Sequence, residues 1–425
     1  MRKHRLRLST LALLALGSLG GSLFAGPQEL SEREHKELGK QFGKYLDPKS
    51  DSDDLEEVRE DVLKALEKIG KKRVGKDGDA VQAALALTVD LGHGAQLSID
   101  YKNARGGKPI AGEIDSPLGT IKYTVWVPKS YRSTSGPYPV VIVMPGLHEG
   151  KPMPSTQFLI EHWTDPVMRD SALIAVLDMP EDVAVWQETK AADGGPGGVM
   201  AAMLTFRDLR DTYAMDSNRV YLMGRETGVA SALSLGSKFP HLFAGVIGQA
   251  GDAGEAGYAN FRNLPVLLQG GGTQAEAFKA GADGAEYGNC ELRPAATEEE
   301  IWAWIEAHPR VSNPSKVTLA LGAPIPNKAY WIEVPPTDGV GLTITAEADR
   351  EANKITVTGE GVPSVTLFLN DDLVDLDKPL TIVLNGVEQT AMIPRSLDDM
   401  LALLKRGTSD PGKFYVAQKT YDLPQ

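Results

Sequence analysis

The chain has 425 residues, of which 42% are hydrophobic and 24% are charged, and its formal net charge is −13. This length exceeds what one hydrophobic core usually serves, and the composition is that of folded protein, so two or three domains are expected. The negative charge argues against a nucleic-acid partner, whose phosphates it would repel. Cys290 is the single cysteine, which excludes an intramolecular disulfide and a multi-cysteine metal site.

The first 25 residues have the layout of a secretory signal peptide. A basic run from Arg2 to Arg7 precedes an apolar stretch from Leu11 to Leu23, and small residues follow near Ala25. This order predicts a signal over 1–25, a location outside the cell or in the periplasm or cell envelope, and no membrane span after cleavage. An uncleaved membrane anchor is the alternative, although the apolar run is shorter than the ~20 residues that a span needs.

Residues 26–95 are predicted to form a helical segment. Leu38 and Phe42 recur at helical spacing, and so do the apolar residues between Leu55 and Ile69, with charged residues between them. A third helix is expected over Asp79–Leu91. The segment is interpreted either as a partner-binding bundle or as an extension that packs against the main domain.

The sequence pattern changes within residues 96–312, where apolar strands alternate with helical stretches from about Gly119 onward. This alternation predicts an α/β domain with a mainly parallel sheet covered on both faces. Strands are expected at 121–127, 140–144, 173–177, 220–223, 244–248 and 266–268, and helices at 197–213, 227–238 and 297–308.

Residues 313–425 change again, to short β-branched or alternating segments bounded by turns, which predict a small all-β accessory domain. Strands are expected at 317–321, 329–334, 342–346, 354–358, 364–369, 380–384 and 413–419, and one helix over 396–405 with Ser396 as its N-cap. Three aromatic residues on these strands, Tyr330, Trp331 and Phe368, are either a ligand platform or core residues.

Residues 220–228, Val-Tyr-Leu-Met-Gly-Arg-Glu-Thr-Gly, have the layout of a nucleophile elbow, the strand-to-helix turn that normally presents an attacking serine. Gly224 and Gly228 are in place, as the strained backbone requires. Glu226 stands at the centre instead of serine. A carboxylate has no proton for a base to remove, and its attack on a carboxyl ester would give an anhydride. The elbow therefore predicts the fold and argues against serine-ester chemistry.

Four further stretches accompany the elbow, at Tyr123–Pro128, Tyr138–Gly146, Asp216–Tyr221 and Lys238–Gly245. Together they resemble the esterase and polyhydroxybutyrate-depolymerase-like branch of the α/β-hydrolase superfamily. The resemblance covers residues 119–310 and implies an α/β-hydrolase-like doubly wound sheet. It implies much less about activity, because one fold carries many functions and the site must be argued separately.

The resemblance also implies where an oxyanion hole would lie. Pro145 replaces the family's histidine in the oxyanion turn, but Gly146 remains. The backbone amides of Leu147 and of Thr227, which follows the elbow residue, are therefore the expected donors to an oxyanion.

The triad partners that the resemblance implies are missing at their expected places. The loop after 266–269, where the acid is expected, contains no carboxylate before Glu276. The stretch 287–296, where the base histidine is expected, contains no histidine. Asp252 is a candidate for a relocated acid, with a solvated loop acid as the alternative.

No pattern in the sequence identifies a histidine that could replace the missing base. His148, just past the oxyanion turn, is the one expected near the cleft, and the sequence does not position His93 or His162. His241 and His308 are expected to be structural. No two ligands share one helical face at metal-binding spacing, so neither a metal site nor any other cofactor is expected.

Three hypotheses follow. In the first, the central domain has lost serine-hydrolase chemistry and is a binding or structural module that uses the cleft around Gly146, Leu147, His148, Glu226 and Thr227. Its partner would be an unknown small molecule, a polymer or an envelope component. In the second, the protein is an active hydrolase with Glu226 as acidic nucleophile or general base. In the third, the C-terminal β domain carries the function as an adhesion or envelope-anchoring module.

Overall fold

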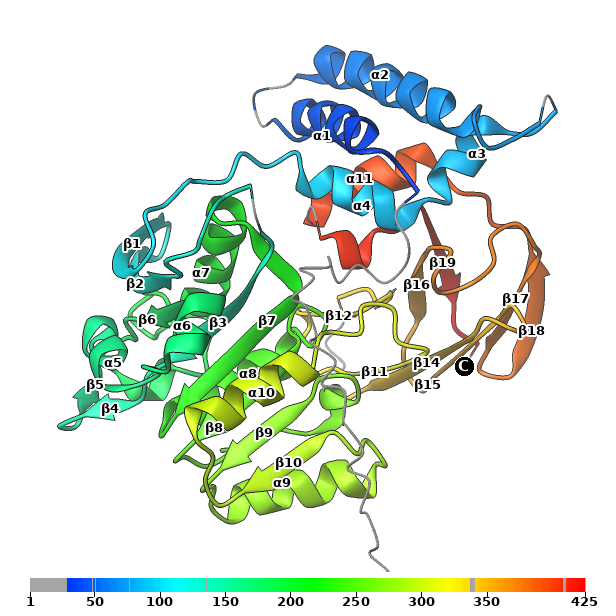
Figure 1. Ribbon diagram of the computed structural model, residues 1–425. Helices are drawn as coiled ribbons and strands as arrows, with labels where there is room; N and C mark the ends of the chain where they lie inside the picture. Colours follow the sequence, from blue (N-terminus) through cyan, green and yellow to red (C-terminus); the bar gives the residue numbers. More distant parts are fainter. Residues whose placement is uncertain are drawn as a thin grey trace, which may run out of the picture.

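The computed structural model describes residues 29–424 except 48, 50, 76, 135, 337–340 and 408–409. The predicted signal peptide at 1–25 lies outside these residues. The described chain combines N-terminal helices, a central α/β part and a C-terminal β part, as Figure 1 shows. In this part of the chain, no helix is both long and apolar enough to cross a membrane.

The central part is built on a mostly parallel sheet, as the sequence predicted. Within the described residues this sheet has eight strands in the order β1-β2-β6-β3-β7-β8-β9-β10. β2 is antiparallel to both of its neighbours, and the pairs from β6 to β10 are all parallel. The strands are β1 (Lys108–Ser116), β2 (Gly119–Val127), β3 (Tyr138–Met144), β6 (Leu173–Leu177), β7 (Met215–Arg225), β8 (Gly245–Gln249), β9 (Val266–Gln269) and β10 (Cys290–Arg293).

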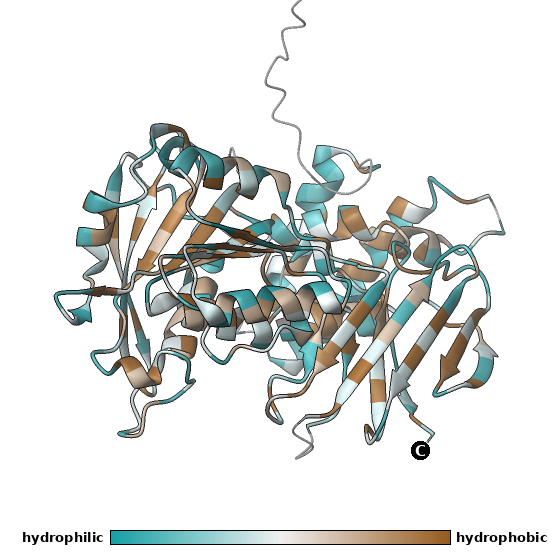
Figure 2. Cartoon of the chain, turned by 90° about the horizontal axis from the view of Figure 1, so that it is seen from below, coloured by the Kyte–Doolittle hydropathy of each residue, from teal (hydrophilic) through white to brown (hydrophobic). Residues whose placement is uncertain are grey.

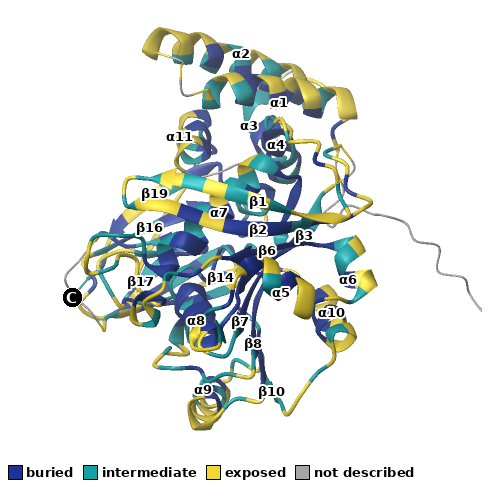
Figure 3. Cartoon of the chain, turned by 90° about the vertical axis from the view of Figure 1, so that its left-hand side faces the viewer, coloured by how far each residue is buried: buried dark blue, intermediate teal, exposed yellow. Residues whose placement is uncertain are grey.

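Helices cover both faces of this sheet because the inner strands are apolar on both sides. In β3, Val140 and Ile142 belong to a core cluster with residues of α7, α8 and α9 on one face, while Val141 and Val143 belong to a cluster with residues of α5, α6 and α10 on the other. Figure 3 shows the central strands as the buried middle layer. Burial of each such side chain stabilises the fold by about 1.5–3 kcal/mol. The helices are α5 (Ser155–Glu161), α6 (Pro166–Ser171), α7 (Gly198–Thr212), α8 (Gly228–Lys238), α9 (Thr273–Gly284) and α10 (Glu298–Ala307), with a small hairpin of β4 (Leu147–His148) and β5 (Lys151–Pro152) and short 3-10 turns η1 (Val183–Val185) and η2 (Ala259–Phe261).

The C-terminal part holds two sheets that share one core. Among the described residues, one sheet has five strands in the order β11-β14-β15-β17-β18, and the other has four in the order β12-β13-β16-β19. Their strands alternate buried and exposed residues, visible as alternating colours in Figure 2. The elements are β11 (Lys316–Ala320), β12 (Lys328–Ala329), β13 (Ile332–Glu333), β14 (Thr343–Asp349), β15 (Lys354–Gly359), β16 (Ser364–Leu369), β17 (Leu380–Leu384), β18 (Val387–Ala391), α11 (Leu397–Gly407), the 3-10 turn η3 (Pro411–Lys413) and β19 (Ala417–Asp422).

Two expectations for this part need correction. The strand expected over 329–334 is split into β12 and β13, because Tyr330 adopts a left-handed backbone with φ 51°. The final strand begins at Ala417 rather than Lys413, which belongs to η3. The aromatic residues Tyr330, Trp331 and Phe368 are all buried in the core, so they do not form a surface platform. Ser396 does cap α11, since its Oγ accepts a hydrogen bond from the Asp399 amide at 3.1 Å.

The N-terminal helices pack on the C-terminal part and share its hydrophobic core. The rings of Phe42 and Phe414 lie 6.3 Å apart, and Arg59 Nε is 2.6 Å from an oxygen of Asp398. The prediction of a single helix over Asp79–Leu91 is wrong. The segment forms two helices that are separated at Leu87, whose backbone is not helical. The helices in the described part of this segment are α1 (Glu32–Leu46), α2 (Ser52–Gly70), α3 (Ala80–Leu85) and α4 (Thr88–Gln96).

Candidate functional site

The elbow lies at the end of β7, where the chain turns sharply into α8. Glu226 occupies the turn with φ 50°, a left-handed conformation that is strained for a side chain of this kind. Its amide donates to the Gln249 carbonyl at 2.8 Å, and its carbonyl accepts from the Val229 amide at 3.1 Å. The turn therefore has the backbone geometry of a nucleophile elbow, with a carboxylate at its tip.

Two glycines make this turn possible. A Cβ at Gly224 would lie 2.2 Å from the Gly228 carbonyl oxygen, and one at Gly228 would lie 2.3 Å from the Met144 carbonyl oxygen. Both obstacles are backbone atoms, which cannot rotate away. The glycine spacing in the sequence thus reports the close approach of β7, α8 and the end of β3.

The carboxylate of Glu226 accepts a hydrogen bond from the backbone amide that was expected to bind an oxyanion. Gly146 turns the chain with φ 81°, and the amide of the next residue, Leu147, donates to Glu226 Oε2 at 3.2 Å. The structure therefore brings Glu226, Gly146 and Leu147 together as the sequence suggested. It adds that the donor is bound by the protein's own carboxylate. Thr227 is exposed and is the N-cap of α8 without a side-chain capping bond.

Arg225, which precedes the elbow residue, is a site residue that the sequence analysis missed. Its Nε lies 3.8 Å from Glu226 Oε1, and both side chains are partly exposed. This separation is an ion pair and not a hydrogen bond, and Arg225 Nε has no hydrogen-bond partner among the described residues. The guanidinium thus offsets part of the carboxylate's charge from one side while the Leu147 amide binds it from the other.

His162 is the second residue that the sequence did not place. Burial lowers the pKa of its imidazole, with the Arg225 guanidinium as the next cause, and the Glu226 carboxylate acts in the opposite direction. His162 therefore interacts electrostatically with Arg225 and Glu226, and burial disfavours its charged form. In the described structure it makes no hydrogen bond to Glu226, and its ring packs instead against Phe158 at 5.1 Å.

His148 follows Leu147 in the oxyanion turn, as its position in the sequence implied, but its ring is engaged elsewhere. Its Nε2 lies 3.2 Å from Gln157 Nε2 on α5, and Gln157 also donates to Glu161 at 2.9 Å. The amide of Gln157 therefore holds the imidazole beside α5. His148 lines the rim of the elbow region rather than contacting the carboxylate.

Asp252, the candidate for a relocated acid, accepts hydrogen bonds from backbone amides. One of its carboxylate oxygens accepts from the Ala253 amide at 2.9 Å and from the Ala275 amide at 2.7 Å, and the other accepts from the Gln274 amide at 3.4 Å. The carboxylate thus caps the N-terminus of α9, where the helix dipole favours an acid.

The sheet order defines the loops in which triad partners would lie. Residues 270–272, which follow β9, are all glycine, and residues 294–297, which follow β10, are Pro-Ala-Ala-Thr. Neither loop contains a carboxylate or an imidazole. Across the described residues, no group of three His, Cys, Asp or Glu side chains is arranged to hold a metal ion.

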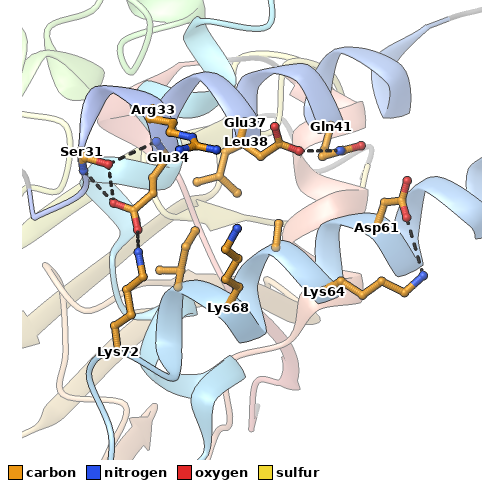
Figure 4. Close-up of a pocket in the computed structure, with 12 residues that line it drawn as sticks. Ser31, Arg33, Glu34, Glu37, Leu38, Gln41, Asp61, Lys64, Lys68 and Lys72 are labelled. Carbon is orange, nitrogen blue, oxygen red and sulfur yellow. Dashed lines mark hydrogen bonds and ion pairs between the residues drawn. The ribbon is translucent and has the colours of Figure 1, made fainter.

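A separate groove lies between α1 and α2, with a volume of about 490 Å³ (Figure 4). Its floor includes Leu38 and Ile69, and its rim carries acids and bases that pair with one another. Lys72 Nζ lies 2.6 Å from an oxygen of Glu34, for example. Lys64 Nζ likewise lies 3.7 Å from an oxygen of Asp61.

The strand order, the crossover helices and the elbow together give the central domain the α/β-hydrolase fold. Comparison with protein-family models gave no match, and neither did comparison with curated protein sequences.

Solved structures that are similar to the chain include three enzymes. A thermostable esterase has 18% identity and a TM-score of 0.38 over 48% of this chain, and the match spans 63% of the esterase's own length. A ferulic acid esterase has 14% identity and a TM-score of 0.37, covering 48% of this chain and 95% of that one. An S-formylglutathione hydrolase from Agrobacterium tumefaciens has 12% identity and a TM-score of 0.34, covering 49% and 95%.

Proposed function

We propose that the chain is an α/β-hydrolase-fold protein that has lost serine-hydrolase turnover and acts as a binding or structural module. The observation that supports this most directly is the hydrogen bond from the Leu147 amide to the Glu226 carboxylate. An oxyanion hole works by offering free, preorganised donors to negative charge that develops in the transition state. Here that donor already binds the side-chain carboxylate of Glu226.

The same carboxylate opposes ester hydrolysis in a second way. A substrate carbonyl placed beside Leu147 would develop its negative charge next to Glu226, so the transition state would be repelled rather than stabilised. Removal of one oxyanion donor in a working hydrolase already costs about 10²–10³ in rate. Loss of the donor and addition of a like charge would both lower the rate of ester hydrolysis.

An active hydrolase with Glu226 as nucleophile or general base is the alternative. The ion pair between Arg225 and Glu226 and the electrostatic interaction of His162 with both residues are what favour it. In that mechanism Glu226 attacks a carbon of an alkyl halide or an epoxide, and halide leaves or the ring opens to an alkoxide that takes up a proton. The imidazole then takes a proton from water, and the resulting hydroxide attacks the carbonyl of the ester intermediate, which releases the alcohol and regenerates the carboxylate. His162 is the imidazole that such a mechanism would use.

Turnover measurements on two variants separate these proposals. We expect no hydrolysis of p-nitrophenyl esters, alkyl halides or epoxides by the natural protein, by Glu226→Gln or by Glu226→Ser. Glu226→Gln keeps the shape of the side chain and removes the charge, while Glu226→Ser restores the hydroxyl without adding a base. Circular dichroism serves as the check that both variants are folded.

Two outcomes would contradict the non-catalytic proposal. Turnover by the natural protein that disappears in Glu226→Gln would establish the acidic-nucleophile alternative. Turnover by Glu226→Ser would show that a base reaches the elbow, and adding His162→Ala to that variant would test the imidazole. His308→Ala is the matched control, because the His308 ring stacks on Trp304 and its Nδ1 lies 2.8 Å from the Trp304 carbonyl.

We also propose that the protein is exported. The basis is the order of basic, apolar and small residues before Gly26. Expression in a host with an export system should give a mature protein that lacks residues 1–25, as measured by N-terminal sequencing and intact mass. A full-length chain that stays in the membrane fraction would instead support the uncleaved anchor.

A further inference from the structure

A second cavity lies away from the elbow, where the central α/β domain meets the C-terminal β domain. Its volume is about 230 Å³. The central domain contributes His241, which lies in the turn after α8. The C-terminal domain contributes Lys328 from β12 and Arg406 from α11. It also contributes Lys413 at the end of η3 and Tyr415 from the segment that follows. Residues more than 170 positions apart in the chain thus converge on one small space.

Positive charge exceeds negative charge around this cavity. Asp410 is the nearest buried carboxylate, and it already forms a bidentate pair with Arg310 at 2.7 and 2.8 Å. Lys413 Nζ shares the same carboxylate at 3.3 Å, so one acid faces two cations. All three side chains are at most 9% exposed, so water contributes little to balancing them.

Lys328 adds a further cation. Its Nζ lies 4.1 Å from the centre of the Phe368 ring, and among the described residues it has no carboxylate within ion-pair distance. The nearby acid Glu333 is instead paired with Arg406 at 3.0 Å. Burial lowers the pKa of Lys413 to about 7 and that of Lys328 to about 8. Burial disfavours the charged ammonium groups more strongly than the carboxylates of Asp410 and Glu333 favour them.

Two buried polar groups on the cavity wall also lack partners. His241 is 7% exposed and Tyr415 is 4% exposed. Within the described chain, neither His241 Nδ1 nor Tyr415 Oη has a hydrogen-bond partner. A buried polar atom without a partner costs about 1–3 kcal/mol, and two on one wall beside two lysines indicate a polar ligand.

We propose that this cavity binds a phosphate-class oxyanion, either inorganic phosphate or a small phosphomonoester. Lys328, Lys413 and Arg406 would supply the positive charge, and Tyr415 and His241 would supply neutral hydrogen bonds. Donors arriving from several elements suit a tetrahedral anion with three or more acceptor oxygens better than the two oxygens of a carboxylate. The proposal is independent of Glu226 and of the proposed function.

Isothermal titration calorimetry on the full chain tests this with inorganic phosphate and glycerol phosphate as probes, at constant ionic strength set with chloride. We expect saturable phosphate binding that Lys328→Gln weakens about tenfold or more, because one charge-assisted hydrogen bond is lost. Lys405→Gln is the matched control. It removes the same charge from an exposed position one residue before Arg406, outside the cavity wall, and should bind phosphate as the natural protein does.

Tyr415→Phe provides a second variant that removes only the hydroxyl, and it should also weaken binding. Tighter binding of glycerol phosphate than of phosphate would identify a phosphomonoester site, and equal or weaker binding would identify a site for the inorganic ion. The proposal fails if phosphate gives no more heat than chloride, or if Lys328→Gln and Lys405→Gln change the affinity equally.

Discussion

Asp410→Asn should lower the free energy of unfolding by about 3–5 kcal/mol, because it removes one partner of a buried ion pair and leaves the other charge uncompensated. Arg310 is 1% exposed and Asp410 8% exposed. The guanidinium also donates to the His241 carbonyl at 2.9 Å and to Asn218 Oδ1 at 2.9 Å, so it cannot leave its place without breaking contacts with the central domain. Chemical denaturation followed by circular dichroism measures the loss.

The matched control for this prediction is Asp398→Asn. Asp398 also pairs with an arginine, Arg59, at 2.6 Å, but its side chain is 69% exposed. Solvent screens such a pair, so the same change should cost only about 0–1 kcal/mol. Equal and small losses in both variants would show that the contact between Arg310 and Asp410 does not hold the two domains together.

The pH dependence of the Asp410 contribution follows from its environment. Burial alone would raise the pKa of this carboxyl, but Arg310 and Lys413 beside it hold the pKa well below its usual range. A lowered pKa in the folded state means that the contribution is present at neutral pH and is lost as the pH falls below the ordinary carboxyl range. The difference between the natural protein and Asp410→Asn should therefore shrink in strong acid.

The sequence predicted those parts of the fold that depend on local pattern. The strands at 173–177, 364–369 and 380–384 have the bounds that their apolar runs indicated. β18 (Val387–Ala391) was missed because all five of its residues are exposed, so no buried face marks it in the sequence. β1 was missed for a related reason: it is an edge strand without fully buried residues.

In the candidate site too, features set by local sequence could be predicted and contacts between distant residues could not. The elbow at Glu226 and the turn at Gly146 were found because glycine spacing records a close backbone approach within a short stretch. The bond between Leu147 and Glu226 joins residues 79 positions apart, and no local pattern reports it. The pairing of Arg310 with Asp410 spans 100 positions, and the cavity beside it exists only once the two domains are in contact.

Trp331→Ala should lower the free energy of unfolding by about 3–5 kcal/mol, the usual range when a fully buried tryptophan is truncated and leaves a cavity. Trp331 has no exposed surface, and its Nε1 donates to the Pro314 carbonyl at 2.8 Å. Its own carbonyl accepts from the Phe368 amide at 2.9 Å, which ties β13 to β16. The side chain thus fills the core of the β domain at the point where the linker from the central domain enters.

Trp331→Phe separates the contribution of packing from that of the hydrogen bond. It keeps an aromatic ring in the core but leaves the Pro314 carbonyl without its donor, so the loss should be smaller than in Trp331→Ala and of the order of 1–3 kcal/mol. The two variants are compared by chemical denaturation with far-ultraviolet circular dichroism. If Trp331→Ala left the stability unchanged, the residue would not be a core residue, and a ligand-binding role for the aromatic residues of this domain would have to be reconsidered. A graded loss, larger for alanine than for phenylalanine, follows from burial alone.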